Sequence, residues 1–205
     1  MCGRYWIDWN PGEELGEIIA RMQRMENPPR TGGEIFPGDR AAVVARSRSG
    51  EIRPFAMEWG YRMEDVKRII NARSETAGEK PLFRDSMQSR RCLVPMSAYF
   101  EWETRGSEAG KKTEKIKYRI APEKAGLHCL AGLYRFEASG PVFTVLTREA
   151  APGIRFIHER MPLILPYSAK EDWLAGADAA DFCCTEMQYT EIEPETKQLS
   201  MEELL

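Results

Sequence analysis

The chain has 205 residues, of which 42% are hydrophobic and 30% charged, and its formal net charge is −3. This composition is typical of one globular domain with a sizeable core, and no apolar run approaches the roughly 18 residues that a membrane helix requires. The first residues also lack the apolar stretch of a signal peptide, so we expect a cytoplasmic protein.

The number and spacing of the cysteines bear on disulfide and zinc sites. The five cysteines are an odd number and show no C-x-x-C spacing, which argues against a disulfide framework and against a zinc site. Four of them are expected to be mostly small buried hydrophobic residues: Cys92, Cys129, Cys183 and Cys184.

The first predicted elements are a strand over 4–7 and a helix over 10–25. Asn10 suits the helix cap, Pro11 suits the first helical position, and apolar residues follow at helical spacing. Residues 27–33, rich in Pro and Gly, indicate a loop. Because the strand begins so early, we expect Cys2 to lie at a strand end and not on a loose tail.

Short strands dominate the rest of the chain. They are predicted over 41–45, 52–59, 93–94, 99–103, 117–120, 130–134, 142–147 and 163–165, with a small helix near 172–174. Residues 106–117 are predicted to form a solvated hairpin tip. The pattern indicates an α+β fold: a single domain with an antiparallel or mixed, curled or barrel-like sheet and a few flanking helices.

The acidic charge is concentrated at the end of the chain. Residues 186–205 contain six glutamates and one lysine, so the remaining 185 residues carry +2. We therefore expect a domain over 1–185 followed by a frayed acidic tail over 186–205. Residues 62–91 contain eight basic and five acidic side chains, which suits nucleic-acid binding but equally suits an ordinary solvated surface.

Cys2 directly follows Met1. The initiator methionine is usually removed when a small residue follows, which would make Cys2 the first residue. An α-amine titrates near ~7.7–8.0, so part of it is uncharged at neutral pH. Such an amine can condense with an aldehyde, after which the adjacent thiol closes a five-membered thiazolidine ring.

Five short segments carry polar residues in a recurrent order. They are Met1-Cys2-Gly3-Arg4, Asn71-Ala72-Arg73-Ser74-Glu75, Arg90-Arg91-Cys92-Leu93-Val94-Pro95, Phe100-Glu101-Trp102 and His158-Glu159-Arg160-Met161-Pro162. Their order and spacing, from residue 1 to about 166, resemble the SRAP family, the SOS response-associated peptidase domain. Members of that family capture abasic sites in single-stranded DNA covalently.

The resemblance implies catalytic roles for Cys2, Asn71, Glu101 and His158. Cys2 would be the covalent residue, Asn71 would place it and the sugar, Glu101 would act as acid and base, and His158 would assist proton transfer and reversal. Opening a deoxyribose ring and expelling water both need a proton carrier. Without the motifs, Glu101 would be interpreted as an outward-facing carboxylate on a strand, Asn71 as a turn residue and His158 as a hydrogen-bonded structural residue. For His128, the structural interpretation is the one we adopt.

The same resemblance implies a DNA-binding set. Matching motifs assign phosphate contacts to Arg4, Arg73 and Arg160, a place beside the strand to Gly3, and stacking walls to Pro37 and Trp102. Weaker candidates are Arg84, Arg90 and Arg91. The chain departs from its relatives after Trp59-Gly60, where a Pro and a second Trp are usual, so Tyr61 or Trp59 either replaces the wedge between bases or packs in the core.

The leading hypothesis is an enzyme of DNA repair that forms a thiazolidine crosslink with an abasic site in single-stranded DNA, with possible lyase or self-cleaving activity. It is expected to be a monomer that needs no metal, cofactor or membrane. Two alternatives remain: a cysteine-dependent hydrolase or autopeptidase, and a non-covalent single-stranded DNA-binding module with an inert Cys2.

Overall fold

A closed five-stranded barrel forms the centre of the computed structural model, which describes residues 2–8, 14–63, 66–106 and 113–193. Its strands are β3 (Arg40–Arg46), β4 (Ile52–Trp59), β8 (Arg91–Met96), β11 (His128–Glu137) and β12 (Gly140–Glu149). The ring closes because β12 pairs in parallel with β4 and antiparallel with β11. The expected α+β fold with a curled, mixed sheet is thereby confirmed.

Short strands extend the barrel at β12 and β11. β7 (Asn71–Arg73) runs parallel to β12, β13 (Arg160–Pro162) runs antiparallel to it, and β14 (Ile164–Pro166) pairs with β11. β7 and β13, which are about ninety residues apart in the chain, therefore flank the same strand, β12. This arrangement brings the Asn71 motif and the His158 motif to the same side of the barrel.

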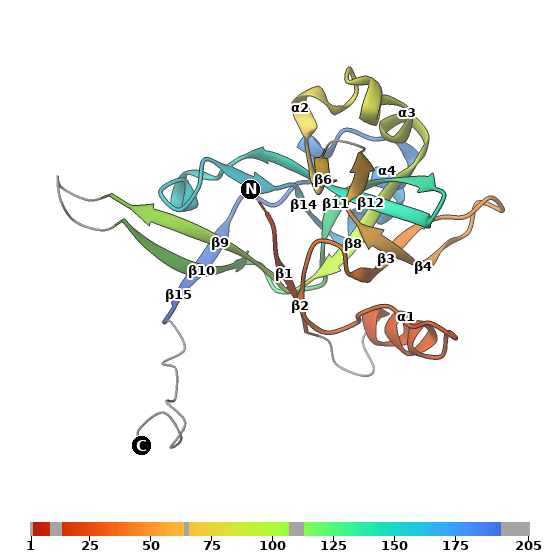
Figure 1. The fold of residues 1–205 in the computed structure, drawn as a ribbon, viewed down its shortest axis with the longest axis horizontal. Coiled ribbons are helices and arrows are strands. Elements are labelled where there is room, and N and C mark those ends of the chain that lie inside the picture. Colours follow the sequence, from red (N-terminus) through yellow and green to blue (C-terminus); the bar gives the residue numbers. More distant parts are fainter. Residues whose placement is uncertain (1, 9–13, 64–65, 107–112, 194–205) are drawn as a thin grey trace.

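A second sheet contains the start of the chain. Its order is β15-β10-β9-β1-β2, with bounds Met187–Ile192, Glu114–Pro122, Ala98–Arg105, Tyr5–Ile7 and Gly33–Ile35, and every pairing is antiparallel. β9 and β10 run together away from the barrel (Figure 1). The predicted strand at 4–7 is thus confirmed as a central strand of a sheet.

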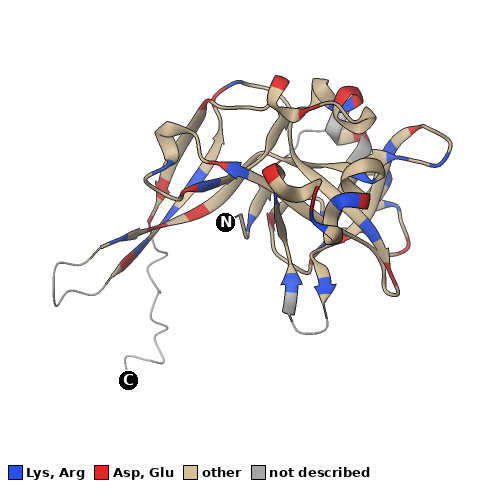
Figure 2. Ribbon diagram, turned by 90° about the horizontal axis from the view of Figure 1, so that it is seen from above, with Lys and Arg blue, Asp and Glu red and all other residues tan. Residues whose placement is uncertain are grey.

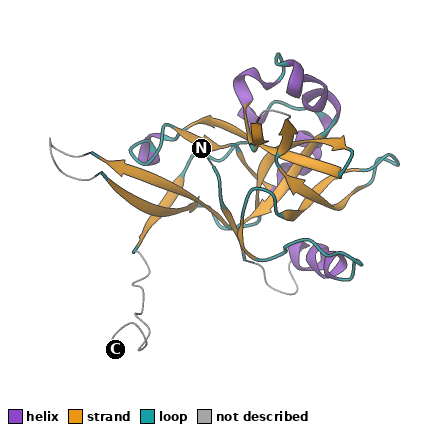
Figure 3. Cartoon of the chain, viewed as in Figure 1, coloured by secondary structure: helices purple, strands orange, loops and turns teal. Residues whose placement is uncertain are grey.

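The helices lie at the periphery of the strands (Figure 3). They are α1 (Glu14–Gln23), α2 (Ser74–Ala77), α3 (Pro81–Ser89) and α4 (Lys170–Ala175), with 3-10 turns at Pro152–Ile154, Tyr167–Ala169 and Ala179–Asp181. The helix predicted over 10–25 is confirmed in its interior, whereas its proposed cap, Asn10 with Pro11, lies outside the described residues. Among the described helices, none is long and apolar enough to cross a bilayer.

Large aromatic residues fill the core where the two sheets meet. Trp59 is fully buried, stacks on Phe143 with ring centroids 6.1 Å apart, and meets Tyr5 edge-on at 5.3 Å. Tyr61 is also fully buried and packs against Phe83. Of the two alternatives for Trp59 and Tyr61, the structure therefore supports core packing, because neither ring can reach a DNA base.

Two predictions about chain ends and turns are wrong. Residues 187–192 are not a frayed tail: they form β15, which pairs with six consecutive residues of β10, so the domain extends past residue 185. Residues 114–117 are not part of a hairpin tip, because β10 already begins at Glu114. In both segments, cross-strand hydrogen bonds order a charged sequence that its composition alone describes as solvated.

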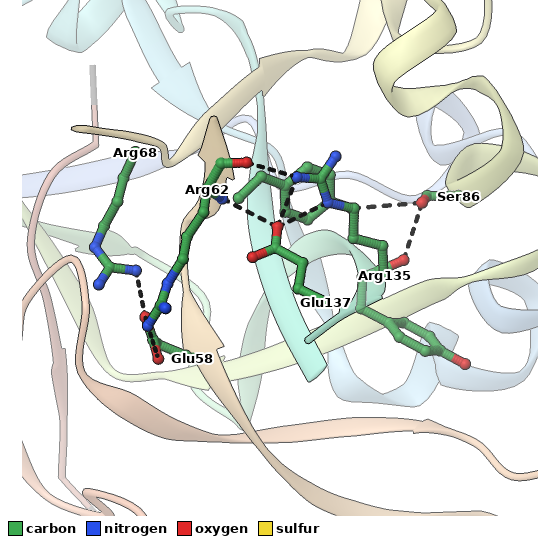
Figure 4. Close-up of polar contacts among 8 residues, drawn as sticks. Glu58, Arg62, Arg68, Ser86, Arg135 and Glu137 are labelled. Carbon is green, nitrogen blue, oxygen red and sulfur yellow. Dashed lines mark hydrogen bonds and ion pairs between the residues drawn. The ribbon is translucent and has the colours of Figure 1, made fainter. Parts of the chain in front are cut away.

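The hairpin after Trp59 is held by ion pairs. β5 (Tyr61–Met63) and β6 (Val66–Ile69) are adjacent strands, and Figure 4 shows Arg62 and Arg68 converging on Glu58 of β4. Burial acts to raise the pKa of Glu58, but hydrogen bonds from both guanidinium groups leave that pKa below its usual value. On the other side of β5, Glu137 accepts from the Arg62 backbone N–H at 3.0 Å. These contacts anchor the β5–β6 hairpin that directly follows Trp59-Gly60.

Candidate abasic-site centre

Cys2 lies just before β1 and is fully buried. The side-chain amide of Asn71 donates a hydrogen bond from Nδ2 to the Cys2 carbonyl oxygen at 2.8 Å. β7 holds Asn71 in place because it pairs in parallel with β12, with Asn71 opposite Val145. The structure therefore brings two predicted site residues, 69 positions apart, into direct contact, and the prediction that Cys2 is held by the sheet is confirmed.

Glu101 shares the buried environment of Cys2. It lies on β9, is 5% exposed, and faces the same side of the sheet as its register partner Tyr118. Burial first, and then the nearby charge of Glu101, raise the pKa of the Cys2 thiol to about 12. At neutral pH the thiol is therefore protonated, and the carboxylate is close enough to influence its ionisation.

His158 follows the Pro152–Ile154 turn, on a segment that packs against β10. Phe156 meets Tyr118 edge-on at 5.8 Å, so this segment lies beside the strand that pairs with Glu101. The Arg160 backbone N–H donates to Nδ1 of His158 at 2.9 Å. The Arg160 carbonyl oxygen lies 3.2 Å from the same Nδ1, so the tautomer of the ring decides which of the two contacts is a hydrogen bond.

Two tyrosines that lie outside the five sequence motifs flank Cys2. Tyr5 of β1 and Tyr99 of β9 are register partners and are almost fully buried. Burial, followed by the proximity of Cys2, raises the pKa of both phenols. The Tyr5 hydroxyl has no hydrogen-bond partner among the described residues. The alternation of the first strand indicates that Tyr5 points inward, whereas Tyr99 comes close to Cys2 because β9 pairs with β1.

Arg4 links several of the predicted DNA-binding residues. Its guanidinium carbon lies 4.8 Å from the Phe36 ring centre and 5.1 Å from that of Trp102, and its Nη1 is 3.3 Å from Glu34. Pro37, next to Phe36, is exposed, and Gly3 is half-buried between Cys2 and Arg4. Arg4 thus contacts Trp102 directly and Phe36, the chain neighbour of the exposed Pro37.

Arg73 and Arg160 form a second group beside Thr147 of β12. Arg73 pairs in register with Thr147 and is exposed at the end of β7. Arg160 donates to the Thr147 carbonyl at 2.7 Å and binds both carboxylate oxygens of Glu75 at 2.8 Å. Hydrogen bonds from Arg160 lower the pKa of Glu75 to about 2. A phosphate at Arg160 would therefore compete with an existing ion pair, whereas Arg73 is accessible.

The weaker arginine candidates have structural partners. Arg91 donates to the carbonyls of Met87 and Ala177 and lies 4.3 Å over the Trp173 ring. Arg84 is exposed beside Asp85 on α3. Arg90, which has a buried Nε without a partner among the described residues, lies just before β8. Arg91 thus fastens α3 and α4 to the barrel.

The remaining sequence candidates are structural. Cys92 and Cys129 are fully buried as expected, whereas Cys183 and Cys184 are half-buried. His128 is 5% exposed on β11, and burial lowers its pKa, in agreement with a structural role. Within the described ranges, no group of three metal-ligating side chains occurs. A cavity of about 770 Å³ lies between α4 and β12, lined by Arg148 and Cys183 but not by Cys2.

Comparison with known proteins identifies the family of the chain. The family model described as SOS response associated peptidase (SRAP) matches residues 1–202, and the chain belongs to this family. The match includes β15, which again places residues 187–192 within the domain.

Individual relatives extend the comparison. The abasic site processing protein YoqW of Bacillus subtilis is 35% identical over 196 residues, which cover 85% of this chain and 80% of YoqW. The abasic site processing protein YoaM of the same organism is 35% identical over 138 residues, which cover 64% of this chain and 56% of YoaM. The crystal structure of a phage-related protein from Bordetella bronchiseptica superimposes with a TM-score of 0.72 at 25% identity, covering 95% of each chain.

Proposed function

We propose that this protein processes abasic sites in single-stranded DNA by forming a thiazolidine crosslink through Cys2 after removal of Met1. The observation that supports the proposal most strongly is the 2.8 Å hydrogen bond from Asn71 to the Cys2 carbonyl, beside the buried Glu101. This hydrogen bond holds the Cys2 backbone, from which the reacting amine and thiol would both extend. The names of YoqW and YoaM, both abasic site processing proteins, point in the same direction.

The proposed reaction has three bond changes. The Cys2 amine nitrogen attacks the aldehyde carbon of the ring-opened sugar and gives a carbinolamine, which loses water to become a Schiff base. The thiol sulfur then adds to the imine carbon, and the thiol proton passes to nitrogen as the ring closes. Glu101 is suited to deliver a proton to the departing hydroxyl and to accept one from the thiol. The imidazole of His158 would carry protons to and from the sugar.

The protonation state of Cys2 favours this chemistry over peptide hydrolysis. A cysteine hydrolase attacks with a thiolate, which requires a lowered thiol pKa. In the chain that retains Met1, which is the form that a self-cleaving hydrolase would act on, burial and Glu101 raise the pKa of the Cys2 thiol to about 12. Thiazolidine formation tolerates a neutral thiol because the amine attacks first and the sulfur adds within the same residue. Shielding of the lesion would follow, since the sugar carbon is then bonded to nitrogen and sulfur.

Arg4 and Arg73 would neutralise phosphates on either side of the lesion, and Trp102 would support an unstacked base. Such contacts do not read base edges, so the proposed binding is independent of sequence. It weakens as salt rises, because each phosphate contact releases counterions.

Denaturing gels with abasic and intact single strands test the proposal. The wild type is expected to give a stable shifted band with the abasic strand, and Cys2→Ala is expected to give none. Cys92→Ala serves as a control for thiol loss away from the site. Intact-mass measurement must show loss of Met1 in the reactive fraction. Crosslinking by protein that fully retains Met1 would refute the mechanism, and peptide turnover without crosslinking would favour the hydrolase alternative.

A further inference from the structure

The two faces of the second sheet differ in charge. Directly paired residues of antiparallel strands lie on the same face of a sheet. Tyr118 of β10 pairs with Glu101 on one side and with Glu191 on the other, so these residues share the face that includes the Cys2 site. Glu103, which accepts from the Tyr118 hydroxyl at 3.0 Å, lies on this face too. We call this the inner face.

The opposite face, here called the outer face, is basic. On β10 it presents Lys115, Lys117 and Arg119, which alternate with the buried Ile116, Tyr118 and Ile120. Arg4 also belongs to the outer face, because its guanidinium lies over the ring of Trp102. Glu34 is the one acidic residue that contacts these cations within the described part of the chain, and it binds both Lys117 and Arg4. Figure 2 shows basic and acidic segments alternating along the long strands of this sheet, as expected when neighbouring residues point to opposite faces.

Aromatic rings are interleaved with the cations of the outer face. Arg119 is the register partner of Phe100, and Lys117 is the register partner of Trp102. The Lys117 ammonium lies 4.2 Å from the Phe100 ring centre and 5.8 Å from that of Trp102. Trp102 is half-exposed. Phe100 is buried, so Trp102 is the ring of this pair that a base can meet. A stacking ring beside cations that meet phosphates is the combination that single-strand binders use.

Two of these cations are accessible to a ligand. Lys115 and Arg119 are exposed, and neither makes an ion pair with any residue in the described ranges. They lie four residues apart on one strand, and an extended strand rises about 3.3 Å per residue, so their backbones are about 13 Å apart. That separation spans about two phosphates of an extended nucleic-acid strand. Lys117, between them, is held by Glu34 at 3.2 Å.

We propose that the outer face binds the single strand of DNA that flanks the lesion, with Lys115 and Arg119 as phosphate contacts. This inference rests on the proposed function and extends it to β10, which lies outside the five sequence motifs. The reaction centre and the outer face lie on opposite sides of the sheet, and the start of the chain connects them: Arg4 is two residues from Cys2, and its guanidinium contacts Trp102 on the outer face. A strand whose sugar lies at Cys2 would then pass around Arg4 to Trp102 and onto β10.

Salt-dependent binding of an intact single-stranded oligonucleotide tests the inference. Each phosphate contact contributes about 0.7 to the slope of log affinity against log salt, so Lys115→Gln with Arg119→Gln should reduce the slope by about 1.4. At 0.1 M salt the same relation predicts about 25-fold weaker binding. The control is Arg48→Gln with Lys124→Gln, which removes two exposed cations from the β3–β4 and β10–β11 turns. This control should bind like the wild type.

Lesion position gives a second readout. Two short oligonucleotides, one with the abasic site near its 5′ end and one with it near its 3′ end, place the flanking strand on opposite sides. The double variant should lose affinity for one of them and leave the other unchanged. An unchanged slope and affinity, or an equal loss for the double variant and its control, would overturn the inference. Failure of the proposed function appears differently, as wild-type protein that binds intact strands but never crosslinks abasic ones.

Discussion

Replacing Asn71 with alanine removes the amide that donates to the Cys2 carbonyl at 2.8 Å. The fold of β7 should persist, because its pairing with β12 uses backbone groups. The Cys2 carbonyl, in a fully buried residue, then loses this partner. We expect the start of the chain to lose its fixed position relative to Glu101.

The magnitude follows from the cost of an unmade buried hydrogen bond, about 1–3 kcal/mol. If that free energy is needed to hold the reactive geometry, it reappears in the activation barrier, where about 1.4 kcal/mol is a factor of ten in rate. The crosslinking rate should therefore fall about 5- to 150-fold, with affinity for intact single strands nearly unchanged.

Asn71→Asp gives a sharper signature than alanine. An ionised aspartate keeps the size of asparagine but places a carboxylate oxygen against the Cys2 carbonyl oxygen, so its rate should fall below that of Asn71→Ala at neutral pH. A protonated carboxyl can donate. The ratio of variant to wild-type rate should therefore recover as pH falls toward the aspartate pKa, ordinarily about 3.9 and higher where burial raises it.

Single-turnover crosslinking with protein in excess, followed on denaturing gels, measures these rates. Asn27→Ala is the matched control, because Asn27 is exposed and its backbone carbonyl, which accepts from Arg40, is retained. Urea unfolding must show that each variant is folded under the assay conditions. A wild-type rate for folded Asn71→Ala would refute the positioning argument.

Two further predictions concern stability, measured as the free energy of unfolding in urea. Glu75 has its pKa lowered to about 2 by Arg160, so the ion pair stabilises the fold above about pH 4.5 and the stabilisation is lost as pH falls toward 2. The free energy of unfolding of the wild type should therefore fall more than that of Glu75→Gln over this pH interval. An equal fall in both proteins would contradict the prediction. Gly132→Ala would place a Cβ 2.8 Å from Cys92 Sγ and 3.2 Å from the Thr144 carbonyl, so a loss of about 1–3 kcal/mol is expected. Adding Cys92→Ala should restore part of it; no loss in the single variant would show that the barrel adapts.

Much of the secondary structure could be predicted because it depends on neighbours in sequence. The strands predicted over 52–59 and 142–147 are confirmed as parts of β4 and β12 of the barrel. The errors fall where long-range pairing overrides composition. Met187–Ile192 is rich in polar residues, yet its backbone hydrogen bonds to β10 make it a strand. The Asn71 segment suited a turn on its own, and parallel pairing with β12 makes it β7.

The order of residues along the chain determined which groups are available for chemistry: an amine and a thiol on Cys2, a carboxylate on Glu101 and an imidazole on His158. Local alternation also determined that Trp102 and Glu101 point to opposite faces. Which groups meet was decided by the tertiary structure. The Asn71–Cys2 contact, the bond between Arg160 and Glu75, and the burial that raises the Cys2 pKa all depend on strands distant in sequence. Residue periodicity specifies the face of a strand but not its partner, because partners are selected by the packing of the whole barrel.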